Sequence, residues 1–201
     1  MIKNIVFDMG NVLLDYNPEV SLQLFLDNEK DRQIIRKELF EGPEWIQGDL
    51  GRMDNETRYE TIKKRIPERL YPGLKDCVYQ WQICMTPLAG AKEFVSSMKE
   101  EGFNIYVLSN ASDTFYEYFP KFLPLDFFDG VMISADVHLI KPDIRIYKTF
   151  LEKYGRKPEE CLFIDDRINN VEGAEAAGMR GIIFNNDFQR LSDLLHDLQG
   201  F

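Results

Sequence analysis

The sequence predicts an α/β fold, an open parallel sheet with helices on both faces and a small α-helical cap inserted after the first strand. Short apolar runs recur along the chain, as buried parallel strands require. From residue 87 onward, stretches with helical periodicity separate these runs, which is the alternation of βαβ units. Residues 17–86 break this rhythm, since they show helical periodicity and no convincing buried strand.

Five runs are expected to be buried strands, and each is followed at once by a polar side chain. The first run, residues 2–7, is mostly apolar and β-branched and ends abruptly at Asp8. The others are residues 105–108, 131–133, 162–164 and 181–184. Because parallel strands end at the same edge of a sheet, we expect the polar residues that follow them to gather there.

Helices are expected between the later strands, and each predicted helix is followed directly by a glycine, a common end signal. The predicted helices are residues 90–101, 143–154 and 171–177. Residues 1–16 and 87–201 are therefore predicted to form a Rossmann-like core domain, and residues 17–86 a helical cap domain.

Composition and charge exclude several classes of function. A chain of 201 residues with 44% hydrophobic residues can bury a substantial core. Its formal net charge of -10 would repel nucleic acid and anionic membranes, so a bound phosphate needs a local cluster of donors or a metal. Cys77, Cys84 and Cys161 form no disulfide framework, and no leader or spanning run is present. We expect a cytoplasmic monomer or weak homodimer with a small-molecule partner.

The polar strand ends predict a shared site at one edge of the sheet. The residues that follow three of the apolar runs, together with one lysine in a further connection, are Asp8, Ser109, Asn110, Lys141, Asp165 and Asp166. Helix N-caps also favour Asp, Ser and Asn, but capping alone explains neither the lysine nor three such strand ends.

This set of side chains indicates phosphoryl transfer. Three carboxylates brought together are costly unless a cation neutralises them, and Mg²⁺ prefers oxygen ligands. With Mg²⁺ in place, Asp8 would be ionised and could attack phosphorus, giving an aspartyl-phosphate that water hydrolyses. Ser109 and Asn110 would hold the phosphoryl oxygens, while Lys141 would stabilise the negative transition state.

Four segments, in order, resemble the four-part signature of the haloacid dehalogenase superfamily of phosphohydrolases: FDMGNV, VLSN, IKPD and FIDDRINNVEGAEAAGM. Each is weak alone, but together they are specific, and the resemblance covers the whole chain. The insertion after the first motif is similar to that family's helical C1 cap. Details such as DMGNV and KPDIRIY most resemble the bacterial glucose-1-phosphate phosphatase group, and more distantly the phosphatase domain of soluble epoxide hydrolase. The resemblance implies hydrolysis of a small phosphomonoester, such as a sugar phosphate like glucose 1-phosphate.

The resemblance also implies a role for each residue of the first three motifs. Asp8 is the expected nucleophile and a metal ligand, and Gly10 would lend its backbone carbonyl to Mg²⁺. Ser109 and Asn110 match the phosphate-binding motif. Lys141 matches the lysine that bridges nucleophile and phosphate.

The fourth motif is expected to complete the metal site. Asp166 is the expected direct ligand. Asp165 would act through water or by pairing with Lys141, and Asn170 would make an outer contact.

The sequence departs from the resembled pattern at Gly10, where many phosphatases of this superfamily carry a second Asp that protonates the leaving oxygen. A general acid is worth ~10²–10⁴ in rate. Asp15, Tyr16 or His138 could replace it, the enzyme could be slow, or turnover could be lost. The resembled glucose-1-phosphate phosphatase group has the same glycine, and the simplest interpretation is that Gly10 serves backbone geometry in a tight turn.

Two other functions stay open on sequence grounds. A metal-independent 2-haloacid dehalogenase also uses an aspartate nucleophile and lacks the second Asp, but the adjacent acids of the fourth motif argue for Mg²⁺. A non-catalytic phosphate-binding or partner-binding module would explain Gly10, but not the retained nucleophile, lysine and acids.

The cap region yields no specificity residue from sequence. Its charged run at 29–38 is most simply a solvated helix face, and Asp54 or Asn55 suits an N-cap position. Four cap aromatic residues could stack on a sugar, although such side chains more often pack between helices. They are Trp45, Tyr59, Tyr79 and Trp81.

Overall fold

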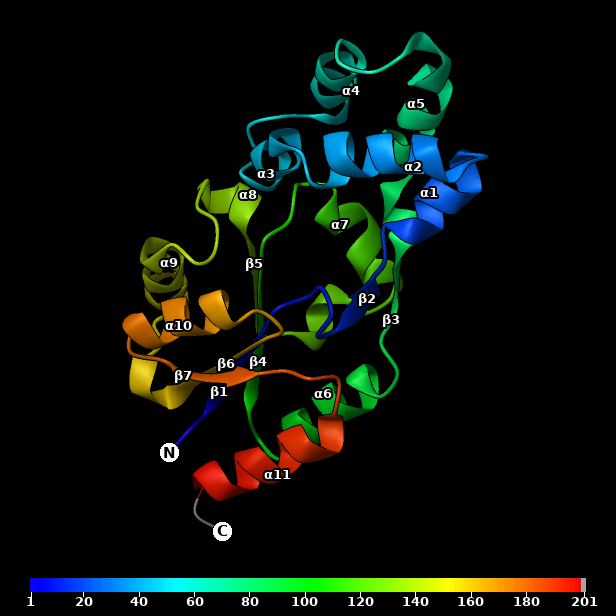
Figure 1. Ribbon diagram of the computed structural model, residues 1–201. Helices are drawn as coiled ribbons and strands as arrows, with labels where there is room; N and C mark the ends of the chain where they lie inside the picture. Colours follow the sequence, from blue (N-terminus) through cyan, green and yellow to red (C-terminus); the bar gives the residue numbers. More distant parts are fainter. Residues whose placement is uncertain (200–201) are drawn as a thin grey trace.

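The computed structural model describes residues 1–199 and has the predicted α/β fold (Figure 1). Five parallel strands form one sheet in the order β5-β4-β1-β6-β7. They are β1 (Asn4–Phe7), β4 (Asn104–Ser109), β5 (Gly130–Ile133), β6 (Cys161–Asp165) and β7 (Arg180–Ile183). All five predicted strands are confirmed, with small shifts of their ends.

The register of the central strands brings the predicted site residues to one edge. Phe7, the last residue of β1, pairs with Val107 of β4 on one side and with Ile164 of β6 on the other. The chain then leaves β1 at Asp8, whose backbone N–H still donates to the carbonyl of Ile164 at 2.8 Å. The three strands therefore end together, and the side chains that follow them are neighbours.

Side chains alternate along each strand, so the sheet divides the core between two helical layers. Ile5 and Phe7 point to one face, and Val6 points to the other. The helices packed on the first face are α6 (Ala91–Glu100) and α11 (Phe188–Gln199), and those on the second are α9 (Ile144–Tyr154) and α10 (Ile168–Ala176) (Figure 1). The three predicted helices of this region are thus confirmed as α6, α9 and α10.

Short elements complete the connections between these strands. They are the helices α7 (Phe115–Tyr118) and α8 (Ser134–Val137), and the 3₁₀ helices Phe119–Lys121, Leu125–Phe127 and Pro158–Glu160. Because α7 and α8 follow β4 and β5, they lie on the side of the sheet where the strands end.

The segment between β1 and α6 is helical, but a small ribbon joins it to the sheet. Strands β2 (Leu14–Tyr16) and β3 (Met85–Pro87) pair antiparallel at the entry and exit of the segment. The ribbon was not predicted, and Met85 falls inside the range expected to lack strands. Three-residue strands are too short to show a sequence alternation.

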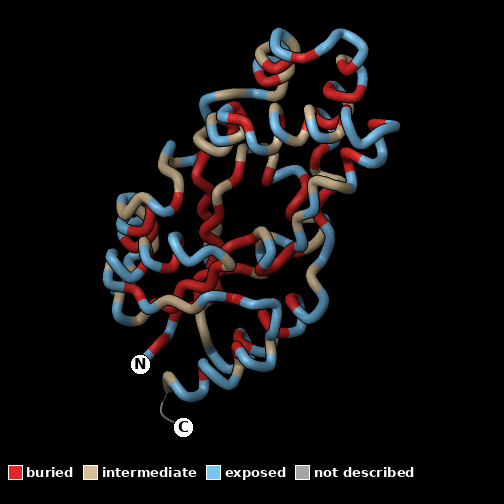
Figure 2. Tube along the Cα trace, viewed as in Figure 1, coloured by how far each residue is buried: buried red, intermediate tan, exposed pale blue. Residues whose placement is uncertain are grey.

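The helices between β2 and β3 share a buried core of their own. They are α1 (Glu19–Phe25), α2 (Glu29–Ile35), a π-helix (Arg36–Phe40), α3 (Pro43–Asp49), α4 (Asn55–Lys63), α5 (Tyr71–Tyr79) and the 3₁₀ helices Glu68–Leu70 and Trp81–Cys84. The buried apolar residues of this cluster are Leu22, Leu26, Ile35, Leu39, Ile62, Ile66, Leu70, Leu74, Cys77 and Val78. Figure 2 shows this second buried zone above the sheet. We propose that residues 17–86 form a cap domain.

The charged run at 29–38 is not simply a solvated face, as the sequence suggested. Asp31 is buried and accepts hydrogen bonds from Arg69 at 2.6 Å and from Asn28 at 2.8 Å. Arg36 donates two hydrogen bonds to Glu19 at 2.7 and 2.8 Å. The run instead connects α2 and the following π-helix to neighbouring helices.

Cys77, Cys84 and Cys161 are buried free thiols, and none belongs to the group of possible metal ligands found among residues 1–199. Within the same range, no helix combines the length and apolar character needed to cross a bilayer.

Candidate active site

A cavity of about 500 Å³ lies where the strands end, between the sheet and the helical segment. The predicted site residues that line it are Asp8, Gly10, Ser109, Asn110, Lys141, Asp166 and Asn170. Asp165 lies behind this lining, fully buried at the end of β6. The structure thus brings together side chains from four separate parts of the chain, as expected from the parallel sheet.

Lys141 joins two of the acids. Its Nζ lies 2.8 Å from Oδ1 of Asp8 and 2.7 Å from Oδ2 of Asp165, and its side chain is 1% exposed. Burial by itself lowers the pKa of Lys141, but the two carboxylates outweigh burial and raise it overall. The ammonium therefore stays charged and fixes the position of the Asp8 carboxylate.

Asp8 is a buried carboxylate with one positively charged and one negatively charged neighbour. Burial raises its pKa to about 6, the positive charge of Lys141 opposes that rise, and Asp165 adds to it. Its Oδ1 atom is close to Lys141 but has no well-aligned hydrogen bond among the described residues. This oxygen therefore has capacity for a further positive partner.

Asp165 is fully engaged by protein groups. Its Oδ1 accepts the backbone N–H of Arg167 at 2.9 Å, its Oδ2 accepts Lys141 at 2.7 Å, and Nδ2 of Asn170 lies 3.0 Å from both oxygens. The structure places Asp165 as a partner of Lys141, one of the two roles considered for it, and places Asn170 in the cavity lining as a hydrogen-bond donor to Asp165. Asp165 thus orients Lys141 more than it faces the cavity.

Asp166 has more freedom than its neighbour. Its Oδ2 accepts a hydrogen bond from Nδ2 of Asn11 at 3.0 Å, and the residue is partly buried at the cavity wall. Burial is the largest cause of its raised pKa, to which Asp165 adds. A cation beside Asp166 would favour the ionised form.

The residues present fit a divalent cation. Asp8, Asp165 and Asp166 each offer a carboxylate oxygen, and these atoms lie within 4.8 Å of one another. Hydrogen bonds in the adjoining turn use the carbonyls of Met9 and Leu14, and within residues 1–199 none of them uses the carbonyl of Gly10. Hard oxygen donors of this kind suit Mg²⁺.

The side chain of Asn110 bonds the backbone of Lys141. Its Nδ2 donates to the carbonyl of Lys141 at 3.0 Å, and its Oδ1 accepts the N–H of Lys141 at 2.8 Å. This pair of bonds fixes the loop that carries Lys141. Phosphate binding at this position would fall to the backbone amide, with the buried hydroxyl of Ser109 beside it.

The interpretation of Gly10 as a glycine required by a tight turn is wrong. The residue in the left-handed region is Asn11, with φ of 55°. A Cβ atom built on Gly10 would meet nothing within 4 Å. Neither backbone conformation nor space therefore excludes a side chain at Gly10.

Two of the three candidates for the missing acid lie away from the cavity. Asp15 is exposed and does not line it, and exposed His138 has Nδ1 2.8 Å from the carbonyl of Leu50. Tyr16 does line the cavity, but burial raises the pKa of its phenol above the ordinary value, which makes it a poor proton donor.

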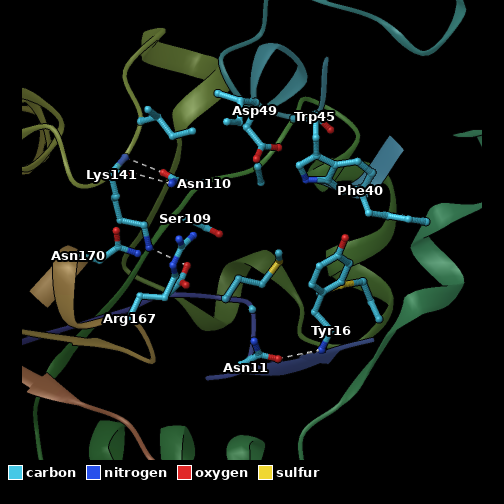
Figure 3. A pocket seen from close by; sticks show the side chains of 18 of the residues that line it. Asn11, Tyr16, Phe40, Trp45, Asp49, Ser109, Asn110, Lys141, Arg167 and Asn170 are labelled. Atoms are coloured by element: carbon cyan, nitrogen blue, oxygen red, sulfur yellow. Dashed lines mark hydrogen bonds and ion pairs between the residues drawn. The ribbon is translucent and has the colours of Figure 1, made fainter. Parts of the chain in front are cut away.

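The aromatic side chains of Tyr16, Phe40 and Trp45 form a wall of the cavity across from Lys141 and Asn170 (Figure 3). Trp45 contacts the rings of Tyr16, Phe40 and Trp81 at centroid distances of 6.2, 5.2 and 5.3 Å, and Trp81 continues to Tyr118 at 5.0 Å. Of the four aromatic residues proposed from sequence, Trp45 and Trp81 line the cavity. The other two, Tyr59 and Tyr79, do not.

Asp49 is a cavity residue that sequence reasoning missed. It is the last residue of α3, and its side chain points into the cavity beside Trp45 (Figure 3). Burial raises the pKa of Asp49 to about 7, Arg58 opposes the rise, and Asp8 adds to it. No spacing rule marks Asp49, because its importance comes from where α3 ends above the sheet. Arg167, exposed after β6, is a second lining residue that was missed.

The chain is similar to known proteins over most of its length. A family model described as haloacid dehalogenase-like hydrolase matches residues 2–178. The chain is 30% identical over 184 residues to the sesquiterpene phosphatase astK of Aspergillus oryzae, covering 90% of this chain and 88% of that protein. It is 23% identical over 192 residues to the drimenol cyclase drtB of Aspergillus calidoustus, covering 92% of this chain but 34% of that longer protein.

A solved structure of similar fold is that of the HAD family enzyme bt-2542 from Bacteroides thetaiotaomicron, in complex with magnesium and inorganic phosphate. It matches with a TM-score of 0.75 and 22% identity, covering 95% of this chain and 99% of that chain. At this identity the likeness bears on the fold.

Proposed function

Because this chain belongs to the haloacid dehalogenase-like hydrolase family, we propose that it is a Mg²⁺-dependent phosphomonoesterase that works through an aspartyl-phosphate on Asp8. The observation that carries the proposal is the position of Lys141, which contacts both Asp8 and Asp165 at the cavity floor. A buried lysine between two acids holds a nucleophile and supplies charge to a phosphoryl group in the same place.

The proposed metal would be held by Asp8, Asp166 and the carbonyl of Gly10, since Asp165 is engaged elsewhere. When bound, Mg²⁺ would neutralise these carboxylates and the charge of the phosphoryl oxygens. The magnesium and phosphate named for the Bacteroides enzyme support this choice for the similar fold.

The chain's own residues perform the remaining tasks. Asp8 attacks phosphorus, its P–O bond forms as the bond to the leaving oxygen breaks, and water later hydrolyses the acyl-phosphate. Lys141 keeps Asp8 oriented and offsets negative charge in both steps. The hydroxyl of Ser109 and the backbone amide of Asn110 would hold phosphoryl oxygens at the end of β4.

The first candidate substrate is a sugar phosphate such as glucose 1-phosphate, as expected from the sequence, and its leaving group would be the sugar. The aromatic faces of Trp45 and Trp81 could pack on the apolar face of a sugar ring. A helical segment over the cavity would also exclude bulk water from the reacting bond.

A second candidate is a phosphomonoester with an apolar leaving group, such as a terpenyl phosphate. One observation favours it: the wall opposite the acids is largely apolar, formed by Phe40, Trp45, Ile46, Trp81 and Met85. The Aspergillus relative named a sesquiterpene phosphatase supports the same choice. The two candidates differ in whether the wall stacks on a ring or surrounds a chain.

The phosphatase proposal is tested with Mg²⁺ and a panel of glucose 1-phosphate, glyceraldehyde 3-phosphate and farnesyl phosphate. Wild type should release phosphate, Asp8→Asn should be inactive, and EDTA should silence the wild type. Asp15→Asn, which changes an exposed acid outside the cavity, should keep full activity. The ranking of kcat/KM across the panel decides between the sugar and the apolar leaving group.

Three outcomes would overturn the proposal. Halide release from 2-chloropropionate without metal would identify a dehalogenase. Phosphate binding without any phosphoryl transfer to Asp8 would identify a binding module. Activity of Asp8→Asn near that of wild type would exclude the proposed nucleophile.

A further inference from the structure

We propose that Asp49 is the general acid and general base of the phosphatase reaction, in place of the acid that the sheet edge lacks at Gly10. This inference rests on the function proposed above and adds a catalytic residue to it. Asp49 belongs to α3 of the helical segment, so the reaction would require the sheet and that segment together.

The acids at the sheet edge already have other partners. Lys141 holds Asp8 and Asp165, and Asn11 donates to Asp166 at 3.0 Å. An acid that binds a cation or a lysine is kept ionised and gives up no proton to a leaving group. A proton donor must therefore come from another wall of the cavity.

Asp49 meets the geometric requirement for such a donor. It lines the same cavity as Asp8, and Figure 3 shows its carboxylate directed into that space. Among residues 1–199, the Asp49 carboxylate forms no side-chain hydrogen bond or ion pair, whereas the backbone carbonyl of Asp49 accepts a hydrogen bond from Ser134. The carboxylate itself is thus free to approach a leaving oxygen.

The surroundings of Asp49 allow both protonation states. The cation that acts on Asp49 is Arg58, which is held by a hydrogen bond to Asn55 at 2.9 Å and lies 5.2 Å from the ring centroid of Trp45. Arg58 forms no ion pair with Asp49 within the described part of the chain. A positive charge nearby but not in contact supports the carboxylate after proton loss and still permits protonation.

The absence of a side chain at Gly48 explains how Arg58 reaches this place. A Cβ atom on Gly48 would lie 1.7 Å from Nη2 of Arg58. The guanidinium therefore occupies the space that any larger residue before Asp49 would fill. α3 and α4 are packed so that Arg58 lies beside the end of α3.

The proposed proton transfers balance over one turnover. In the first step, Asp8 forms a bond to phosphorus, the P–O bond to the leaving group breaks, and protonated Asp49 gives its proton to that oxygen, releasing an alcohol. In the second step, ionised Asp49 takes a proton from water while the water oxygen attacks phosphorus and the bond to Asp8 breaks. Phosphate leaves, and both carboxyl groups return to their starting states.

The test compares leaving groups in the Mg²⁺-loaded enzyme. Phenethyl phosphate needs a proton on its leaving oxygen, whereas 4-nitrophenyl phosphate needs little help. For Asp49→Asn, we expect single-turnover cleavage of phenethyl phosphate to fall by ~10² or more. The initial burst of 4-nitrophenolate should persist, followed by slow turnover and accumulation of phosphorylated Asp8, measured by rapid quench.

Matched variants separate catalysis from folding. Asp49→Glu should recover part of the phenethyl phosphate rate, and Asp27→Asn, an exposed acid of the same segment, should behave as wild type. Equal losses on both substrates would assign Asp49 a structural role and overturn the inference, as would no loss. If wild type and Asp8→Asn are equally inactive, the proposed function fails instead, so the two failures are distinguishable.

Discussion

At the residue scale, the site depends on one lysine that is buried with two acids. Removing charge from water is costly, and a buried lysine keeps its proton only when anions surround it. Asp8 and Asp165 supply those anions at 2.8 and 2.7 Å. Asn170 and the backbone of Arg167 then satisfy Asp165, so that each charge in the group has a defined partner.

Gly10 is a residue at which a substitution is informative. Because a Cβ there has open space, Gly10→Asp should be accepted without disturbing the turn. In the Asp49→Asn background, we expect Gly10→Asp to raise the single-turnover rate on phenethyl phosphate at least about tenfold, since it returns an acid to the cavity. Stopped-flow or quench kinetics measure the effect.

Gly10→Asn is the control for this prediction, because it adds a side chain of similar size without a transferable proton. It should leave the rate of Asp49→Asn unchanged. A rise with Gly10→Asn as large as that with Gly10→Asp would show that the effect is steric, and no rise with either would show that proton transfer does not limit the reaction.

At the element scale, short helices of the inserted segment place the cavity residues. α4 begins after Asp54, whose side chain accepts the N–H of Thr57 at 2.8 Å, as the sequence suggested for this N-cap. The first turn of α4 carries Arg58, which is buried and contacts Trp45. The start of this helix therefore influences the cavity wall.

Replacing the N-cap should weaken α4. Asp54→Ala removes an acceptor for an unpaired helical N–H, so we expect Tm to fall by roughly 2–4 °C in a thermal melt. Asp54→Asn keeps the acceptor and should stay within about 1 °C of wild type. A similar fall in both variants would mean that charge at this position, and not the cap hydrogen bond, stabilises the helix.

At the scale of the whole molecule, the cavity is formed between two separately packed cores. One core belongs to the sheet and its helices, and the other to helices α1 to α5. The β2–β3 ribbon joins them. A metal held at the end of the sheet would bind the folded chain and not the unfolded one, so it should stabilise the molecule.

We therefore expect Mg²⁺ to raise Tm. At about 100 times its dissociation constant, a single ion adds about 2.7 kcal/mol, which corresponds to roughly 5–10 °C for a chain of this size. Calorimetry with NaCl at matched ionic strength provides the control. Asp166→Asn should abolish the rise, and an equal rise in that variant would place the ion elsewhere.

Much of the fold was predictable because the signals are local. Five apolar runs and three glycine-terminated helices specify a parallel sheet, and the parallel sheet specifies that Asp8, Ser109 and Asp165 meet at one edge. The charged residues that follow these strands could therefore be selected without coordinates. The β2–β3 ribbon and the ion pairs made by residues 29–38 were not predictable. Three-residue strands and ion pairs between helices produce no periodic pattern in the sequence.

The sequence by itself indicated the sheet, its polar edge and the residues Asp8 and Asp166, because strand ends lie at fixed places in a parallel fold. Lys141 lies in a connection and was selected by its match to the third motif of the resembled family. Only the tertiary structure decided what faces that edge. Asp49 and Trp45 reach the cavity because α3 packs across the strand ends, a relation between elements that no spacing along the chain encodes. Burial between the two cores then gives Asp49 its raised pKa.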